Sequence, residues 1–142
     1  MKIFITVDNK NGISFNKRRQ SRDVKLVDYI LSIVGDDYLL MNSYSFELFK
    51  NATYKNITVD DDFLSCTKNA FYFVENQLLS STLNNIDVLY LCKWNRNYPS
   101  DKKLDFNIKD YFEIVSSEDI IGKSHEKITI EKWVKLWKKV LK

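Results

Sequence analysis

The chain has 142 residues, 44% of them hydrophobic and 14% aromatic, enough for the core of one domain, and we expect a single domain over residues 1–142. It contains one histidine and two cysteines. Because zinc sites made of histidine and cysteine need three or four such ligands, we expect no such site. We also expect no other metal and no cofactor. The net charge of +3 is uneven, with basic residues in excess over 1–30 and 93–142 and acidic residues in excess between them. Either the two basic ends converge on an anion-binding face, or their lysines are ordinary solvated side chains.

The N-terminal segment and the cysteines indicate where in the cell the protein is expected. The apolar run in residues 3–7 is too short for a signal peptide or a membrane span. Cys66 and Cys92 are isolated in the sequence, which is typical of reduced, buried thiols in the cytoplasm. We therefore expect a cytoplasmic protein that does not enter a membrane.

The first half of the chain predicts strands that alternate with short helices. Residues 2–7 are β-branched and aromatic, as in a buried strand. Apolar side chains recur at helical spacing over 22–34, between a Ser21 N-cap and a Gly35 stop, and predict a helix. Shorter elements are predicted as a strand at 38–41, a helix from Asn42 or Ser43 to Phe49, a strand at 57–59 and a helix that starts at 60–62.

The second half predicts more strands and a C-terminal helix. Its apolar runs predict strands at 70–74, 88–92, 111–115 and 127–130, and Asn76 caps a short helix over 77–84. A last helix is predicted after residue 130, because one helical face collects Ile130, Trp133, Val134, Trp137 and Val140. The apolar strands lack clean alternation, which is typical of strands covered on both faces. The predicted fold class is α/β, with a single open, mostly parallel sheet and short helices on both faces.

The order of elements and several motifs form one pattern over most of the chain. Residues 7–13 form a Val-Asp-x-x-x-Gly turn after the first strand, 39–47 run from a strand into a capped helix, and 73–76 lead into another helix. The strand at 111–115 and then Ser124-His125 follow late in the chain. This pattern resembles a shortened, degenerate dihydrofolate reductase-like domain. The resemblance implies that fold, and it places Asp23 where the family has its substrate-binding acid.

Departures from this family argue against its chemistry. Glu75 and Asn76 stand where the family has a Gly-Gly pair that admits the cofactor pyrophosphate, and a carboxylate there repels a phosphate. Asn42 and Ser43 replace its Gly-Arg phosphate-binding step, and the proline-tryptophan of its mobile substrate loop is absent. The resemblance therefore implies the fold but not reduction with a nicotinamide cofactor.

A second resemblance is closer in residues. The segments 11–23, 73–76, 94–99 and 124–129 are similar to a group of short bacterial proteins that automated annotation labels ribonuclease Z. True ribonuclease Z binds two zinc ions through several histidines, and this chain has one. We therefore expect that the protein is not a zinc-dependent ribonuclease Z.

The densest functional signal is the polar segment before the first predicted helix, with Asn16, Arg18, Arg19 and Arg22. Guanidinium groups beside the free N–H groups of a helix start suit a phosphate or a carboxylate. The alternative is that these arginines pair with the acidic middle of the chain or remain solvated. Glu75 and Asn76, at the end of a strong strand, are further ligand-binding candidates.

A second signal follows the strand at 88–92, where the loop contains Trp94, Asn95, Arg96 and Tyr98. Arginine flanked by aromatic rings can stack on a nucleobase. The alternative is an aromatic loop that closes the edge of the core.

His125 is the third signal, because it is the one side chain here that ordinarily titrates near neutral pH. With Glu126 or another acid to orient it, His125 is a candidate general base or acid. Metal-independent phosphodiester cleavage needs a second group, and Asp23 or Glu75 would have to serve. The alternative is a structural histidine.

These observations favour a small binding protein rather than an enzyme. We expect it to recognise an anionic ligand (nucleotide, nucleic acid or phosphate) or a macromolecular partner through the basic loop and helix. The alternatives are a metal-independent nuclease or phosphodiesterase that uses His125, and an inhibitor or immunity-type module that binds a protein.

Overall fold

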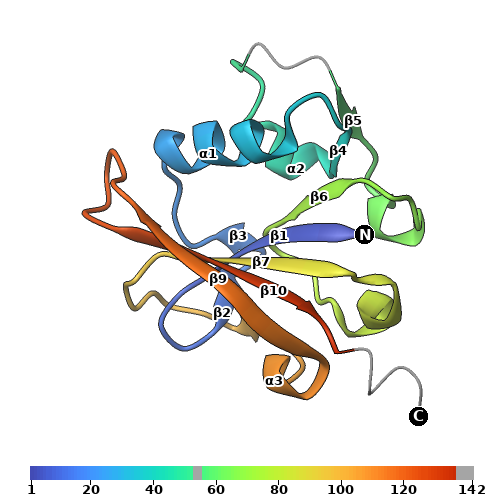
Figure 1. Ribbon diagram of the computed structural model, residues 1–142. Coiled ribbons are helices and arrows are strands. Elements are labelled where there is room, and N and C mark those ends of the chain that lie inside the picture. Colours follow the sequence, from blue (N-terminus) through green and yellow to red (C-terminus); the bar gives the residue numbers. More distant parts are fainter. Residues whose placement is uncertain (53–55, 137–142) are drawn as a thin grey trace.

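The computed structural model describes residues 1–52 and 56–136, which form two β-sheets (Figure 1). The main sheet has the strand order β5-β4-β6-β1-β7-β10-β9. The strands from β5 to β7 are parallel, and β10 and β9 extend the sheet antiparallel. The predicted α/β fold with a mostly parallel sheet is confirmed. The strands are β1 Lys2–Val7, β4 Leu39–Met41, β5 Ile57–Val59, β6 Phe71–Val74, β7 Val88–Lys93, β9 Phe112–Ile120 and β10 Ile128–Lys135.

The second sheet is small and was not predicted. It has the order β3-β2-β8, with β2 Gly12–Phe15, β3 Arg18–Arg19 and β8 Lys102–Lys103. Two of these strands have only two residues, too few for a recognisable pattern. Asn16 and Lys17, with left-handed φ angles of 51° and 63°, make the two-residue turn between β2 and β3. This turn sets the position of Arg18 and Arg19.

Apolar side chains pack on both faces of the main sheet. On one face, Phe4 and Tyr90 stack with ring centroids 4.4 Å apart beneath two α-helices. On the other face, Tyr72 and Trp133 are buried under short helical segments. The first face carries α1 Val24–Val34 and α2 Ser43–Phe46, and the second carries the 3-10 helices η1 Phe63–Ser65 and η2 Ser80–Asn85 together with α3 Ile108–Tyr111. Cover on both faces explains why the central strands do not alternate between apolar and polar residues.

The helix predicted over 22–34 is confirmed as α1, but Asp23 is its N-cap rather than Ser21. The Asp23 carboxylate accepts a hydrogen bond from the N–H of Lys25, and Gly35 ends the helix. The helix predicted from residue 60 forms later, as η1, and the one predicted over 77–84 forms as η2 without Asn76 as its cap.

The prediction of a C-terminal helix is wrong for residues 131–135, which continue β10. Residues three apart lie on opposite faces of a strand. Ile130 therefore joins the core under α1, whereas Trp133 joins the core on the other face. Burial on both faces of this strand produces the same spacing as one face of a helix. Trp137 and Val140 lie outside the described residues. None of the helices in the described part of the chain is long and apolar enough to cross a membrane.

Candidate functional site

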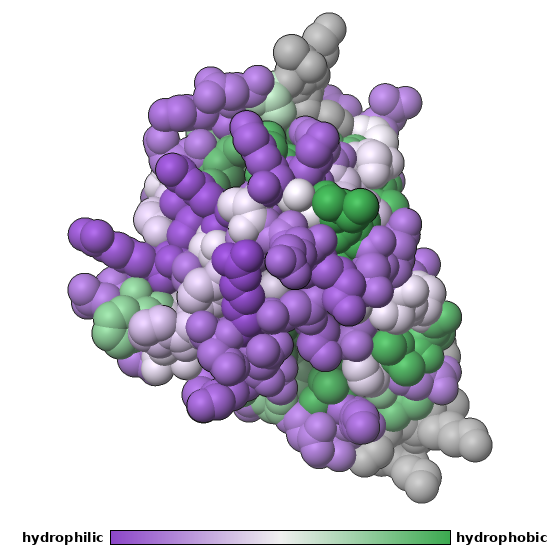
Figure 2. All heavy atoms as spheres, turned by 90° about the vertical axis from the view of Figure 1, so that its left-hand side faces the viewer, coloured by the Kyte–Doolittle hydropathy of each residue, from purple (hydrophilic) through white to green (hydrophobic). Residues whose placement is uncertain are grey.

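The carboxyl ends of β1, β4, β6 and β7 lie at one edge of the main sheet, the side on which open α/β sheets bind ligands. This edge is on the left in Figure 1 and faces the viewer in Figure 2, where hydrophilic side chains cover most of the surface. Three segments distant in the sequence meet there: residues 18–23 before α1, 94–98 after β7 and 122–125 in the β9–β10 loop.

His125 is at the centre of this meeting point. Its side chain is buried, and both ring nitrogens lie within hydrogen-bond distance of a partner. Nδ1 is 2.9 Å from Asp23 Oδ2. Nε2 is 3.0 Å from Ser21 Oγ and 3.1 Å from Tyr98 Oη. The Trp94 ring stacks on the imidazole with centroids 4.7 Å apart. We call Ser21, Asp23, Trp94, Tyr98 and His125 the histidine cluster.

Asp23 determines that Nδ1 of the His125 ring is protonated. Burial alone would raise the pKa of the Asp23 carboxyl, but hydrogen bonds from the N–H of Lys123, from His125 and from the N–H groups of Ser124 and Lys25 hold its pKa far below the usual range. As a carboxylate, Asp23 only accepts, so Nδ1 of His125 carries a proton. In the neutral ring Nε2 is then the acceptor that faces the hydroxyl groups of Ser21 and Tyr98.

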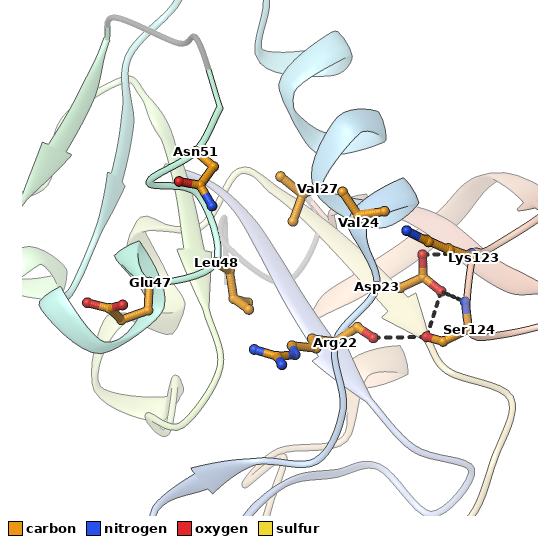
Figure 3. A pocket seen from close by; sticks show the side chains of 9 residues that line it. All are labelled: Arg22, Asp23, Val24, Val27, Glu47, Leu48, Asn51, Lys123 and Ser124. Carbon is orange, nitrogen blue, oxygen red and sulfur yellow. Dashed lines mark hydrogen bonds between the residues drawn. The ribbon is translucent and has the colours of Figure 1, made fainter.

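The β9–β10 loop approaches the start of α1 closely (Figure 3). A Cβ atom on Gly122 would lie 2.5 Å from Asp23 Oδ2 and 2.7 Å from the carbonyl oxygen of His125, so only glycine fits without a shift. The hydroxyl of Ser124 lies 3.1 Å from Asp23 Oδ2 and 3.2 Å from the carbonyl oxygen of Arg22. These contacts hold the loop, and with it His125, against the residues that precede the helix.

Arg19 and Glu75 form a second polar network at the end of β6. The carboxylate of Glu75 is 1% exposed and accepts from Arg19 Nε at 2.8 Å, from Arg19 Nη2 at 3.1 Å and from Ser45 Oγ at 2.8 Å. The guanidinium also lies over the Tyr44 ring. Burial alone would lower the pKa of Arg19, but Glu75 raises it. Arg19 therefore pairs with the acidic middle of the chain, which was the alternative interpretation of this basic segment.

Arg18 and Arg22 are exposed, and within residues 1–52 and 56–136 neither guanidinium has a hydrogen-bond or ion-pair partner. Both line a groove of about 480 Å³, which we call the arginine groove and which is also lined by Arg19, Ser21, Tyr44 and Ser124. Ser21, whose hydroxyl contacts His125, is thus one of the residues that line the groove.

A second hollow of about 510 Å³, the α1 hollow, shares Arg22 and Ser124 with the arginine groove. Figure 3 shows Val24 and Val27 on one side of it and Leu48 on the other. The apolar side chains of this hollow therefore lie next to the cationic side chains of the groove.

The candidate ligand-binding residues in the loop after β7 make structural contacts instead. Trp94 is 3% exposed and stacked on His125, so its ring is closed to a nucleobase. The amide of Asn95 donates to the carbonyl oxygen of Lys127, and Arg96 Nη2 donates to that of Ser124. Glu126 is exposed and lines a separate hollow; the acid that contacts His125 is Asp23.

Asn16 and Asn76 hold the β2–β3 turn in place. The N–H of Asn16 donates to Asp101 Oδ2, and the side-chain amide of Asn76 donates to the carbonyl oxygen of Lys17. The carbonyl oxygen of Asn76 accepts from Lys102 Nζ. Glu75, beside Asn76, is buried in the pair with Arg19 and does not line the arginine groove.

Residue type alone does not indicate Ser21, Ser124 and Gly122 as parts of the site. The position of Ser21 before a predicted helix indicates only a helix cap, and its contact partner His125 follows 104 residues later. No local pattern indicates such a contact. In the described part of the chain, no group of three or more His, Cys, Asp or Glu side chains is placed to hold a metal ion.

Comparison with known proteins shows the fold. The sequence matches no described protein family and no curated protein. The structure is similar to dihydrofolate reductase from Enterococcus faecalis, solved in complex with NADP(H) and RAB-propyl. The TM-score is 0.65 over 94% of this chain and 95% of that one, with 9% sequence identity. The predicted dihydrofolate reductase-like fold is therefore confirmed, at a sequence identity that shows the fold alone.

Proposed function

We propose that the protein binds a phosphate-bearing ligand of the nucleotide class in the arginine groove. The observation that carries this proposal is the pair of exposed guanidinium groups, Arg18 and Arg22, without partners among the described residues, above a groove that reaches Ser21. Guanidinium groups bind phosphate through paired, charge-assisted N–H donors.

The adjoining α1 hollow supports a ligand larger than phosphate. Val24, Val27 and Leu48 offer an apolar surface for a ring, next to the guanidinium of Arg22. Glu47 also lines this hollow, but its carboxylate is paired with Lys50 at 2.7 Å, which offsets part of its charge. A nucleoside monophosphate has one charged end and one ring end, which is the combination that the two hollows offer.

Calorimetric titration with adenosine 5′-monophosphate, inorganic phosphate and adenosine tests the proposal. We expect the monophosphate to bind, and adenosine to bind much more weakly. The Arg18→Ala/Arg22→Ala double variant should bind roughly 100-fold more weakly, because a hydrogen bond to a charged group contributes about 1.5–3 kcal/mol. Lys25→Ala, at an exposed basic residue of α1 that lines neither hollow, is the matched control. No binding by the wild type, or equal binding by the double variant, would contradict the proposal.

A second candidate function is metal-independent phosphodiester cleavage. The observation that favours it is that Asp23 orients His125 while Nε2 of the ring faces the hydroxyl of Ser21 at the groove. We expect wild-type protein in EDTA to cleave a mixed-sequence RNA oligonucleotide and His125→Ala to lose this cleavage. An inactive wild type would exclude RNA as the substrate.

A further inference from the structure

We propose that Ser21 is the nucleophile of a phosphate-ester hydrolase, with His125 as its general base and Asp23 as the residue that positions His125. This inference rests on the ligand proposed above, because the phosphate in the arginine groove is the group that Ser21 would attack. It assigns Ser21 a chemical role that its place before a helix does not suggest.

The first argument is connectivity. Asp23 Oδ2 lies 2.9 Å from His125 Nδ1, and Nε2 on the other side of the same ring lies 3.0 Å from Ser21 Oγ. A carboxylate, an imidazole and a hydroxyl in this order are the arrangement by which hydrolases activate serine. Both bonds are within the range at which a proton passes directly.

The second argument is burial. Asp23 and His125 are 5% and 3% exposed, whereas Ser21 is half-buried and lines the groove. The two groups that support the nucleophile are therefore shielded from water, whereas Ser21 lies at the groove in which we propose that the ligand binds. The stacked Trp94 ring further restricts the imidazole to one orientation.

The third argument is charge. Attack on a phosphate ester places negative charge on the phosphoryl oxygens, and guanidinium groups stabilise such charge. Arg18 and Arg22 line the same groove as Ser21, and neither has a partner within the described residues. Because Arg19 is paired with Glu75, Arg18 and Arg22 are the unpaired cations among the described residues that line this groove.

The reaction needs only the ester and water. Oγ of Ser21 attacks phosphorus, its proton passes to Nε2 of His125, and the bond from phosphorus to the leaving oxygen breaks as that oxygen takes the proton. The phosphoserine is then attacked by water, which gives a proton to Nε2. The bond from phosphorus to Oγ breaks, and Oγ takes the proton, so that Ser21 and His125 return to their starting forms.

Tyr98 supplies a test of this geometry, because its hydroxyl is 3.1 Å from the same nitrogen. In the neutral ring Nε2 has one lone pair, so Ser21 and Tyr98 compete as donors. Tyr98→Phe should leave the lone pair to Ser21 and raise the reactivity of the serine. A histidine with a merely structural role gives no such increase.

A fluorophosphonate probe tests the proposal without knowledge of the substrate. An activated serine displaces fluoride from the probe and becomes phosphonylated, which peptide mass spectrometry locates. We expect an adduct on Ser21, none in Ser21→Ala, and a labelling rate lower by roughly 10²–10⁴-fold in His125→Ala. Asp23→Asn should also slow labelling, and Tyr98→Phe should accelerate it, while circular dichroism verifies that each variant is folded. The other serines of the chain are internal controls.

The outcomes separate this inference from the proposed function. If adenosine monophosphate binds but Ser21 is not labelled, or is labelled no faster than the exposed Ser116, the nucleophile is refuted and the ligand proposal stands. If Ser21 is labelled but no phosphate-bearing ligand binds, the ligand proposal is refuted and so is a phosphate ester as the substrate, while Ser21 stands as an activated nucleophile. Labelling that persists unchanged in folded His125→Ala also overturns the assignment.

Discussion

Arg19 and Asp23 lie four residues apart and serve different networks. Arg19 binds Glu75 with two nitrogens, and Asp23 binds His125 and the backbone of the β9–β10 loop. Both networks lie at the carboxyl edge of the main sheet. At the residue scale, therefore, one short segment secures the edge of the sheet, while Arg18 and Arg22 are exposed and have no partner among the described residues.

Removal of Arg19 should destabilise the fold. Arg19→Ala leaves the carboxylate of Glu75 buried without its cation, and breaking a buried pair in this way typically costs about 3–5 kcal/mol. Urea denaturation measures the free energy of unfolding. Arg19→Ala combined with Glu75→Gln should cost less than the sum of the two single changes, because the double variant leaves no unpaired charge. Additive costs would show that the pair is not coupled.

Asp23 should make stability depend on acid pH. Its pKa is far below the usual range in the folded protein, whereas an unfolded Asp has a pKa of about 3.9. Below that value the unfolded chain binds a proton that the folded chain does not, so the contribution of Asp23 is present above about pH 4 and is lost as the pH falls further.

Asp23→Asn should therefore be less stable than the wild type at pH 7 and should lose less stability between pH 5 and pH 2. Asp28→Asn, at an exposed acid on the same helix, is the control. Thermal unfolding at pH 7 and between pH 5 and pH 2 measures the stability of the wild type and of each variant. Parallel curves for wild type and Asp23→Asn would contradict the role of Asp23.

At the element scale, the strands and the first helix could be predicted from sequence, but the ends of several elements could not. Val27, Ile30 and Val34 show the period of α1 directly, because one face of the helix packs on the sheet. A helix was predicted in place of the second half of β10, because Ile130 and Trp133 enter cores on opposite faces of the sheet. The strands β3 and β8 form only because the β2 segment between them pairs on both edges.

The contact between the β9–β10 loop and the start of α1 can be tested at Gly122. Gly122→Ala introduces a methyl group into a space that Asp23 and the backbone of His125 occupy. We expect a loss of about 1–3 kcal/mol in the free energy of unfolding, as for other overpacked sites. Binding of adenosine monophosphate should weaken as well, because the loop carries Ser124 into the groove. A variant with unchanged stability and unchanged binding would show that this close contact of the loop with the start of α1 is not needed for the fold or the site.

At the scale of the whole molecule, the sequence indicated the segments of the site but not their arrangement. The basic segment, the loop after β7 and His125 were each recognisable from residue type. That Ser21 and Asp23 meet His125 depends on the fold, because more than one hundred residues separate them. The scarcity of histidine, which argues against zinc chemistry, also leaves His125 as the single imidazole to observe in the protein.

The most direct measurement is nuclear magnetic resonance of the His125 ring during titration with adenosine monophosphate. Since the chain has one histidine, the ring signals need no assignment. We predict that Nδ1, which faces the Asp23 carboxylate, is protonated, and that the ring signals shift and saturate in the wild type but not in Arg18→Ala/Arg22→Ala. A proton on Nε2 alone, or ring signals that do not move at saturating ligand, would contradict a site in which His125 lies beneath the arginine groove.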